Sequence, residues 1–383
     1  MNLCNVAPSY NYEVIVIGAG PAGSLAAAEA ARAGKSVLIV EKDTEVGIPE
    51  HCGGLVSTSG LKNLIDDYSV IKKKIDKGVL IVKGRSFDFS FKKSNLVEID
   101  RQLLDKKLAS LAIKEGSDIV LGSYAFYKKE NNVNLVYVKG KKLSAKYVIN
   151  AGGNAYYPKK EGKILATQFL FALKNGNYDG VAIYINKELM PQMFGWYIPY
   201  DEGLAKVGAP GSADVALLVA KKILNNLNLT GEPIKIMSSY LINGGPVFKN
   251  NTNDYALIGD AGGQTKPTTG GGIIFGGIGG KIAGKLVAED ALGKYNEEYY
   301  ERGPGKDLIN QVKIKDVYDA LNDSAIYKIV EVLHKNDVSF SGDEFDFHSK
   351  FIKRILGDPL LALKVAEAIP SVVLSYLKSL FFS

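Results

Sequence analysis

The chain has 383 residues, enough for two or three domains, and its hydrophobic (46%) and charged (23%) fractions are those of an ordinary globular protein. The net charge of +6 lies in short, separate lysine groups without a recognised binding motif, so we expect no nucleic-acid partner. Only Cys4 and Cys52 are present, which argues against a disulfide framework and indicates a reducing, cytoplasmic setting. We predict no signal peptide, no metal site and, without a run of about 18 uncharged apolar residues, no membrane-spanning helix.

The N-terminal part predicts a complete βαβ unit. Residues 13–17 are a nearly continuous apolar run, typical of a strand buried on both faces. An alanine-rich helix is expected over residues 24–33 and a second buried strand over residues 36–40. Residues 18–23 read Gly-Ala-Gly-Pro-Ala-Gly and lie between the first strand and the helix. A glycine turn at this position indicates dinucleotide binding.

Each residue of this turn has a predicted task. Gly18 permits the tight turn, Gly20 lets the backbone approach a pyrophosphate, and Gly23 allows the helix to pack closely on the strand. Ala22 lies among the N–H groups at the helix start, which bind phosphate charge. Glu41, at the end of the second strand, can accept hydrogen bonds from ribose hydroxyls. The alternative is a structural turn beside a surface carboxylate, which the complete unit disfavours.

Strands and helices continue along the chain. A helix is expected over residues 99–115, then strands over 133–138 and 147–150. A second sheet is expected after residue 166, with strands over 181–185 and 204–208 and a helix over 213–227. A strand over 255–258 leads into a glycine-rich segment with a helical continuation to Leu292, and the chain beyond residue 297 is mostly helical in pattern.

Three distant motifs, in order, resemble those of the flavoprotein group that includes p-hydroxybenzoate hydroxylase. Gly259 and Asp260 follow a strand, as in the second flavin motif of that group, where the Asp meets the ribityl chain. Arg101 opens a long helix, as does an arginine near the flavin there, and Gly152 lies in a middle strand-turn motif. The resemblance implies FAD as the cofactor. The alternative for Asp260 is a helix N-cap.

The resemblance and the element order predict a mixed α/β and α+β fold with three parts. A discontinuous Rossmann-like FAD-binding domain is expected over residues 1–85, 96–160 and 246–292. An antiparallel-sheet substrate domain is expected over residues 86–95 and 161–245, and a helical C-terminal region over 293–383.

A narrower resemblance rests on three further motifs. Residues 49–55 read Pro-Glu-His-Cys-Gly-Gly-Leu, residues 194–199 read Phe-Gly-Trp-Tyr-Ile-Pro, and residues 266–273 read Lys-Pro-Thr-Thr-Gly-Gly-Gly-Ile. Together they resemble the geranylgeranyl reductase family, especially the archaeal digeranylgeranylglycerophospholipid reductases, over residues 1–290. The second motif departs from the family pattern Tyr-x-Trp-x-Phe-Pro, because Phe194 replaces Tyr and Ile198 replaces Phe.

This family resemblance implies saturation of prenyl C=C bonds in archaeal membrane-lipid precursors by hydride transfer from reduced flavin, which requires a desolvated, aligned substrate. It implies that Trp196, Phe194 and Tyr197 line an apolar tunnel, although such aromatics can equally pack a core. Cys52 would reach the active face of the flavin, the alternative being an inert buried thiol. His51 could donate a proton or lie in a surface loop.

The third motif opens a helix. The N–H groups of Gly270, Gly271, Gly272 and Ile273 can face the N1/C2=O edge of the flavin and stabilise its anionic reduced form. The glycines that follow, over residues 276–280, are interpreted as helix-packing positions.

Partners and alternatives follow from the same reasoning. The substrate is expected to be a prenylated lipid or prenyl diphosphate, with NAD(P)H or ferredoxin as electron donor. Residues 359–382 are amphipathic, which indicates either a helix packed on the protein or a peripheral membrane contact. The alternative functions are an FAD-dependent aromatic monooxygenase, an electron-transfer flavoprotein that reduces quinone or ferredoxin, and a flavin-binding structural or tRNA-modifying subunit.

Overall fold

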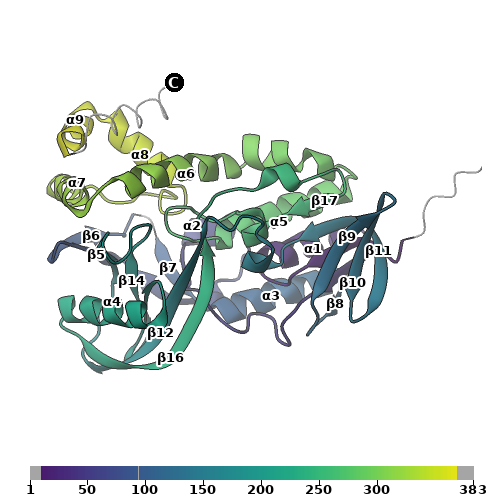
Figure 1. Ribbon diagram of the computed structural model, residues 1–383, viewed down its shortest axis with the longest axis horizontal. Helices are drawn as coiled ribbons and strands as arrows, with labels where there is room; N and C mark the ends of the chain where they lie inside the picture. Colours follow the sequence, from purple (N-terminus) through teal and green to yellow (C-terminus); the bar gives the residue numbers. More distant parts are fainter. Residues whose placement is uncertain (1–9, 94, 369–383) are drawn as a thin grey trace, which may run out of the picture.

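The computed structural model describes residues 10–93 and 95–368. The molecule is elongated, with one seven-stranded sheet towards each end and the last helices of the chain above the left-hand sheet (Figure 1). A third, smaller sheet has three strands in the order β3 (Leu55–Ser57), β7 (Leu96–Ile99) and β4 (Ile71–Ile75).

The first sheet has the order β8-β2-β1-β11-β10-β9, with β17 paired to the far end of β11. Its parallel strands are β1 (Tyr12–Ile17), β2 (Val37–Val40), β8 (Asp118–Val120), β11 (Lys141–Asn150) and β17 (Tyr255–Leu257). The antiparallel hairpin of β9 (Ala125–Glu130) and β10 (Val133–Val138) completes it. Both faces of β1 are buried: Val14 and Val16 pack with the helices, and Ile15 and Ile17 pack with the hairpin. This explains the continuous apolar run in the sequence.

Two helices meet on this sheet through small residues. α1 (Pro21–Arg32) packs against α5 (Ile273–Ala288), and α3 (Arg101–Lys114) lies on the other side of α1. A Cβ at Gly280 would lie 2.1 Å from the carbonyl oxygen of Ala22, and one at Gly284 would lie 2.4 Å from that of Ala26. Gly280 and Gly284 are therefore required by backbone contact between the helices, and Gly277 and Gly279 by close contacts with the side chains of Leu64 and Gln264.

The second sheet has the order β16-β12-β15-β14-β13-β5-β6. Its strands are β16 (Thr230–Ile242), β12 (Lys163–Asn175), β15 (Leu204–Pro210), β14 (Gly195–Asp201), β13 (Val181–Ile185), β5 (Lys77–Val82) and β6 (Arg85–Ser90). All neighbours are antiparallel except β13 and β5. The early segment that enters this sheet contains both β5 and β6, so it begins at Lys77.

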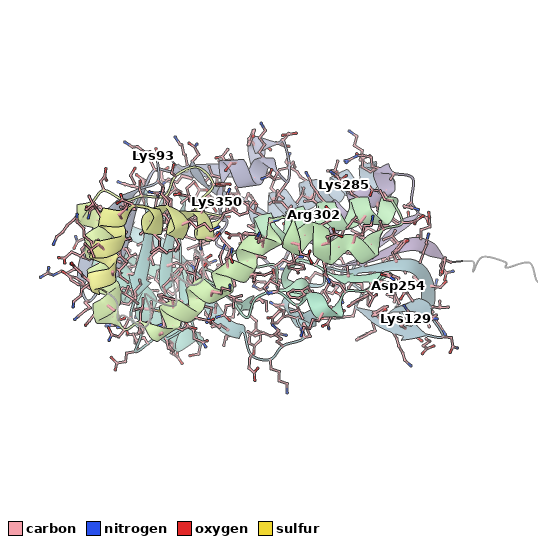
Figure 2. All side chains as sticks on the ribbon, turned by 90° about the horizontal axis from the view of Figure 1, so that it is seen from above. Lys93, Lys129, Asp254, Lys285, Arg302 and Lys350 are labelled. Carbon is pink, nitrogen blue, oxygen red and sulfur yellow. The ribbon has the colours of Figure 1, made fainter. Side chains whose placement is uncertain are left out.

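Helices cover both faces of the second sheet. α4 (Ala213–Asn226) covers one face, and the C-terminal helices cover the other (Figure 1). These are α6 (Gly305–Ala320), α7 (Asp323–Lys335), α8 (His348–Gly357) and α9 (Pro359–Ala368), and α2 (Thr58–Lys62) lies near the small sheet. Figure 2 shows them from above, with the Lys129–Asp254 ion pair (2.5 Å) at the opposite end of the molecule.

The C-terminal helices are held by an apolar core. Phe87 of β6 and Ile185 of β13 pack with Ile326 and Val330 of α7. Within residues 10–93 and 95–368, no helix is long and apolar enough to cross a bilayer. The amphipathic tail predicted over residues 359–382 is described only as far as α9, and residues 369–382 lie outside the described part.

Candidate active site

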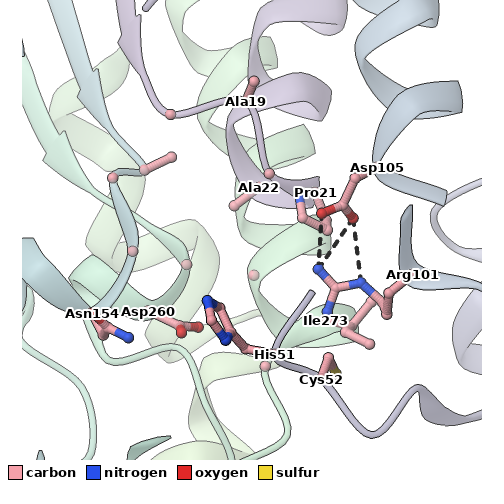
Figure 3. A pocket seen from close by; sticks show the side chains of 18 of the residues that line it. Ala19, Pro21, Ala22, His51, Cys52, Arg101, Asp105, Asn154, Asp260 and Ile273 are labelled. Atoms are coloured by element: carbon pink, nitrogen blue, oxygen red, sulfur yellow. Dashed lines mark hydrogen bonds and ion pairs between the residues drawn. The ribbon is translucent and has the colours of Figure 1, made fainter. Parts of the chain in front are cut away.

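A cavity of about 470 Å³ lies where β1, β2 and β11 end. This is the edge at which parallel α/β sheets bind their ligands. All predicted cofactor-binding residues except Gly23 line it, and so does Cys52, whereas Trp196 and Phe194 do not. Figure 3 shows the β1–α1 turn, Arg101, Cys52 and Asp260 around this space.

The glycine turn has the geometry that a pyrophosphate requires. Gly18 has a φ of +97°, and a Cβ there would lie 2.5 Å from the carbonyl oxygen of Ala151. A Cβ at Gly23 would lie 2.0 Å from the carbonyl oxygen of Gly18, so Gly23 serves packing. Gly20 differs, because no described atom lies within 4 Å of the position of its Cβ, which opens into the cavity. The turn thus leaves a cradle that a side chain at Gly20 would fill.

Glu41 is fixed at the edge of this cradle. Its Oε2 accepts a 2.7 Å hydrogen bond from the N–H of Ala19, and its Oε1 accepts one of 3.0 Å from the N–H of Asp43. Each carboxylate oxygen can accept a further hydrogen bond. The carboxylate therefore remains available for hydroxyl groups in the cavity.

Arg101 and Asp105 form a bidentate pair on the first turns of α3 (Figure 3). The guanidinium donates to Oδ1 and Oδ2 of Asp105 at 3.1 Å each from Nη2, and at 3.3 Å from Nε. Burial alone would lower the pKa of Arg101, but Asp105 and the Cys52 side chain outweigh it and raise this pKa above its ordinary value. The site therefore holds a permanent cation beside Cys52.

Asp260 faces the same cavity from the turn after β17. Among the described residues, none donates a hydrogen bond to its carboxylate, and the N-caps of the adjoining helical turns are Ile258 and Gly272. Asp260 therefore caps neither turn. Burial raises the pKa of Asp260, and Arg101 partly offsets this effect. A half-buried carboxylate without a donor is costly, so the position suits a ligand that brings hydroxyl groups.

The Cys52 loop rests on the second sheet. A Cβ at Gly53 would lie 2.7 Å from Cδ1 of Ile198 on β14. The amide nitrogen of Gln168 on β12 lies 3.5 Å from the carbonyl oxygen of Cys52, and Trp196 in turn donates to Gln168. The predicted catalytic residues Cys52 and Trp196 are thus joined through Gln168, with only Cys52 on the cavity wall. His51 also lines the cavity, with an exposed side chain.

The aromatic residues at the start of β14 point to opposite faces of the sheet, because side chains alternate along a strand. Phe194 and Trp196 lie on the face of the C-terminal helices and the Cys52 loop, where Phe194 packs among apolar residues of the helices. Tyr197 points the other way, into the core beneath α4, and its hydroxyl donates to the carbonyl oxygen of Tyr178. The expectation that Tyr197 lines a tunnel is wrong, because its neighbours on the strand occupy that face.

Lys266 and Asp346 line the cavity, although the sequence analysis gave them no role. Lys266 is buried, and its Nζ donates to the carbonyl oxygen of Phe345 at 3.1 Å and lies 3.6 Å from Oδ1 of Asp346. Burial lowers the pKa of Lys266, and Asp346 partly offsets this. Lys266 opens the Lys-Pro-Thr-Thr-Gly-Gly-Gly-Ile motif, so its place in that motif could have marked it as a site residue. Asp346 precedes α8 in a segment without a motif, and only the fold brings it here.

A second, smaller cavity of about 180 Å³ lies between the second sheet and the C-terminal helices. It is bounded by β5, β6, β13, α7, α8 and the segment before α8. Of the described residues that line it, only Ser90 and Ser339 have polar side chains. Phe91, on its wall, makes an edge-on contact with Phe345 at 6.2 Å, and Phe345 adjoins Asp346 of the larger cavity. The Phe91–Phe345 contact is thus one point at which the surroundings of the two cavities meet.

Comparison with known proteins agrees with this geometry. A family model described as FAD dependent oxidoreductase matches residues 13–156. A digeranylgeranylglycerophospholipid reductase of Methanocella arvoryzae is 29% identical over 353 residues, covering 82% of this chain and 89% of that protein. Digeranylgeranylglycerophospholipid reductase 2 of Methanopyrus kandleri is 27% identical over 368 residues, covering 85% and 91%.

A solved structure extends the comparison to the fold. The geranylgeranyl bacteriochlorophyll reductase-like protein of Thermoplasma acidophilum superposes with a TM-score of 0.77 at 23% identity, covering 94% of this chain and 99% of that one. The predicted fold class, the FAD cofactor and the resemblance to geranylgeranyl reductases are confirmed. The predicted domain boundaries and the roles of single site residues stay predictions.

Proposed function

We propose that this chain, an FAD-dependent oxidoreductase similar over more than four fifths of its length to digeranylgeranylglycerophospholipid reductases, saturates C=C bonds of geranylgeranyl chains in membrane-lipid precursors. The observation that carries the proposal is the second, apolar cavity of about 180 Å³ between the second sheet and the C-terminal helices. Among the described residues, none with a charged side chain lines it, which suits a hydrocarbon chain and not a polar substrate.

The residues around the larger cavity suit FAD in distinct ways. The Gly18–Gly23 turn and the start of α1 would hold the pyrophosphate, Glu41 the ribose, and Asp260 the ribityl hydroxyls. The N–H groups that open α5 and the ammonium of Lys266 would stabilise negative charge on the ring. When bound and reduced, FAD supplies a hydride to the substrate.

The protein would align the prenyl chain and exclude water from the reacting bond. The paired rings of Phe91 and Phe345 would help to direct a prenyl chain towards the cofactor cavity, and the Cys52 loop would keep water from the reacting bond. We further propose NAD(P)H or ferredoxin as the electron donor and a bilayer or a carrier as the source of the lipid. Leu360 (73% exposed) and Leu363 (60%) on α9 are exposed apolar residues compatible with such a contact.

The test is a single turnover without oxygen. The flavin of the holoprotein is reduced with dithionite and mixed with digeranylgeranylglyceryl phospholipid in detergent. We expect flavin reoxidation together with a mass gain of two hydrogens per saturated bond. Reoxidation by a quinone alone would support the electron-transfer alternative, and oxygen consumption with a phenol would support the monooxygenase. Either result without lipid saturation would refute the proposal.

A further inference from the structure

A buried charge cluster lies directly beneath the Cys52 loop. Lys206 of β15 is 1% exposed, and its Nζ lies 2.8 Å from Oε1 of Glu50 and 3.3 Å from Oε1 of Glu98 on β7. Glu98 is fully buried and Glu50 is 7% exposed. Three segments far apart in the sequence therefore place two carboxylates on one ammonium in the protein interior.

The charges of this cluster do not balance. Oε2 of Glu98 is buried and has no hydrogen-bond partner among the described residues. Burial raises the pKa of Glu98 to about 7, although Lys206 opposes the rise. With Glu98 protonated, one carboxylate faces one ammonium, which avoids burying an uncompensated charge. The cluster therefore holds a proton that it can release near neutral pH.

Other charged groups surround the cluster without replacing its members. The ring of Tyr200 lies 4.2 Å from Nζ of Lys206 and 4.0 Å from Nζ of Lys72, so a second cation faces Glu98 from β4. Cys52 faces Lys206 from the loop. On the side of Glu50 stand Gln102, whose amide lies 3.4 Å from Oε2, and Asp105, which is paired with Arg101.

The cluster reaches the cofactor cavity through Glu50. Glu50 lines that cavity two residues before Cys52, whereas Lys206 and Glu98 do not line it. Gly54 lies against Glu98, because a Cβ there would be 3.2 Å from Oε1, and its carbonyl oxygen accepts a 2.9 Å hydrogen bond from the N–H of Ile99. The loop that carries Cys52 is thus fastened over the buried carboxyl.

We infer that Glu50, Lys206 and Glu98 form a proton relay for the reduction, with Glu50 as the group that meets the substrate. The inference rests on the proposed function. Saturation adds a hydride to one carbon of the C=C bond and a proton to the other, and the two electrons come from the reduced flavin of that function.

The relay supplies the proton. The resting Glu50 is a carboxylate, so it first takes a proton from the Lys206 ammonium and then releases it to carbon as the π bond breaks and the C–H bond forms. Lys206 is reprotonated by Glu98, which is left as a carboxylate and regains a proton from solvent through Glu50 and Lys206, because Glu50 is the member of the cluster on the cavity wall. Glu50 is the catalytic residue, and Lys206 and Glu98 are positioning residues that act through it.

The first measurement needs no flavin. Infrared spectra of the apoprotein between pH 5 and pH 9 should show a protonated-carboxyl band from Glu98 that titrates near the pKa of about 7. Its band should vanish in Glu98→Gln and persist in Asp319→Asn. Asp319 is the matched control, because it too pairs with a buried lysine, Lys315, and has a buried oxygen without a partner among the described residues. Persistence of the band in Glu98→Gln would overturn the inference.

The second measurement is the single turnover of the holoprotein over the same pH range. We expect the wild-type rate to fall as pH rises through about 7, and this dependence to disappear in Glu98→Gln with a loss of about 10-fold or more at low pH. Glu50→Gln should lose about 100-fold, and Asp319→Asn should match the wild type. Glu98→Asp should restore a pH dependence.

The two measurements separate the possible failures. A wild-type protein whose reduced flavin no prenyl lipid reoxidises refutes the proposed function and the relay with it. A wild type that turns over, with an unchanged rate and pH profile in Glu98→Gln, refutes the relay alone. A lower melting temperature in Glu98→Gln without a change in pH profile marks a purely structural cluster and also overturns the inference.

Discussion

The indole Nε1 of Trp196 donates a 2.8 Å hydrogen bond to the side-chain oxygen of Gln168. Gln168 is buried and approaches the backbone of Cys52, so Trp196 influences the cofactor cavity through one intervening side chain. The aromatic motif of β14 thus supports the loop that carries the thiol, and its tryptophan does not itself face the cofactor cavity.

Trp196→Phe should lower the free energy of unfolding by about 1–3 kcal/mol, because a buried acceptor loses its donor. It should also slow lipid saturation, since Gln168 is released from its position beneath Cys52. Tyr197→Phe is the control: it removes the bond to Tyr178 on the opposite face and should change stability only. Denaturant unfolding and single-turnover rates of both variants test this, and a normal rate in Trp196→Phe would contradict it.

Gly20→Val should abolish flavin binding and leave the apoprotein folded. The φ of Gly20 is −70°, which suits any residue, and the added side chain would extend into the space expected to hold the pyrophosphate. Gly23→Ala should instead weaken the fold, because its Cβ would meet the carbonyl oxygen of Gly18. Flavin absorbance and melting curves distinguish the two, and stoichiometric flavin in Gly20→Val would show that the turn has another task.

Asp260→Ala should weaken FAD affinity by about 1–3 kcal/mol, the contribution of a charged hydrogen bond. The apoprotein should melt at the same or a higher temperature, because a half-buried carboxylate without a described donor is removed. Titration of the apoprotein with FAD, together with melting curves of both forms, checks the prediction. An equal loss of stability in the apo and holo forms would contradict the ribityl contact.

Cys52→Ala should reduce prenyl saturation much more than it reduces FAD binding. The thiol lines the cavity beside the Arg101 guanidinium, and its loss leaves the pyrophosphate and ribose contacts untouched. Mass spectrometry of the lipid products should show partly reduced chains. A normal product distribution from the alanine variant would remove Cys52 from the mechanism.

Stability should depend on pH through Glu98. Its pKa is raised from 4.5 to about 7 on folding, so the native state binds the extra proton between these values. The free energy of unfolding should therefore fall as pH rises through this window, by about 3 kcal/mol in total, and stay level above it. Denaturant unfolding of wild type and Glu98→Gln across the window measures the difference. Parallel curves for the two proteins would be the contrary result.

The parts of the site that the sequence predicted are those whose signal is local. The turn from Gly18 to Gly23 needs only a strand, a glycine pattern and a helix, all within one βαβ unit. Asp260 and Gly270 likewise directly follow a strand or open a helix. Such positions are defined by their neighbours in sequence, so the predicted residues gather around one cavity.

The parts that the sequence did not predict depend on contacts between distant segments. Glu98 and Lys206 meet only because β7 and β15 converge beneath the Cys52 loop, and Asp346 reaches Lys266 from the C-terminal region. A lysine within the otherwise apolar residues 204–210 was the one available sign of a buried partner. The parallel pairing of β5 with β13 has no periodic signature, since strand alternation is the same for either direction.

The spread of the cavity wall along the chain has a consequence for synthesis on the ribosome. Gly18 and Glu41 emerge early, but Asp260, the opening of α5 and finally Asp346 complete the wall only when most of the polypeptide has been made. A nascent chain that ends before Asp260 has the pyrophosphate turn without its opposite side, so it cannot enclose a flavin. Cofactor capture is thus a late event that follows translation of the C-terminal helices, and truncated chains should leave the ribosome colourless.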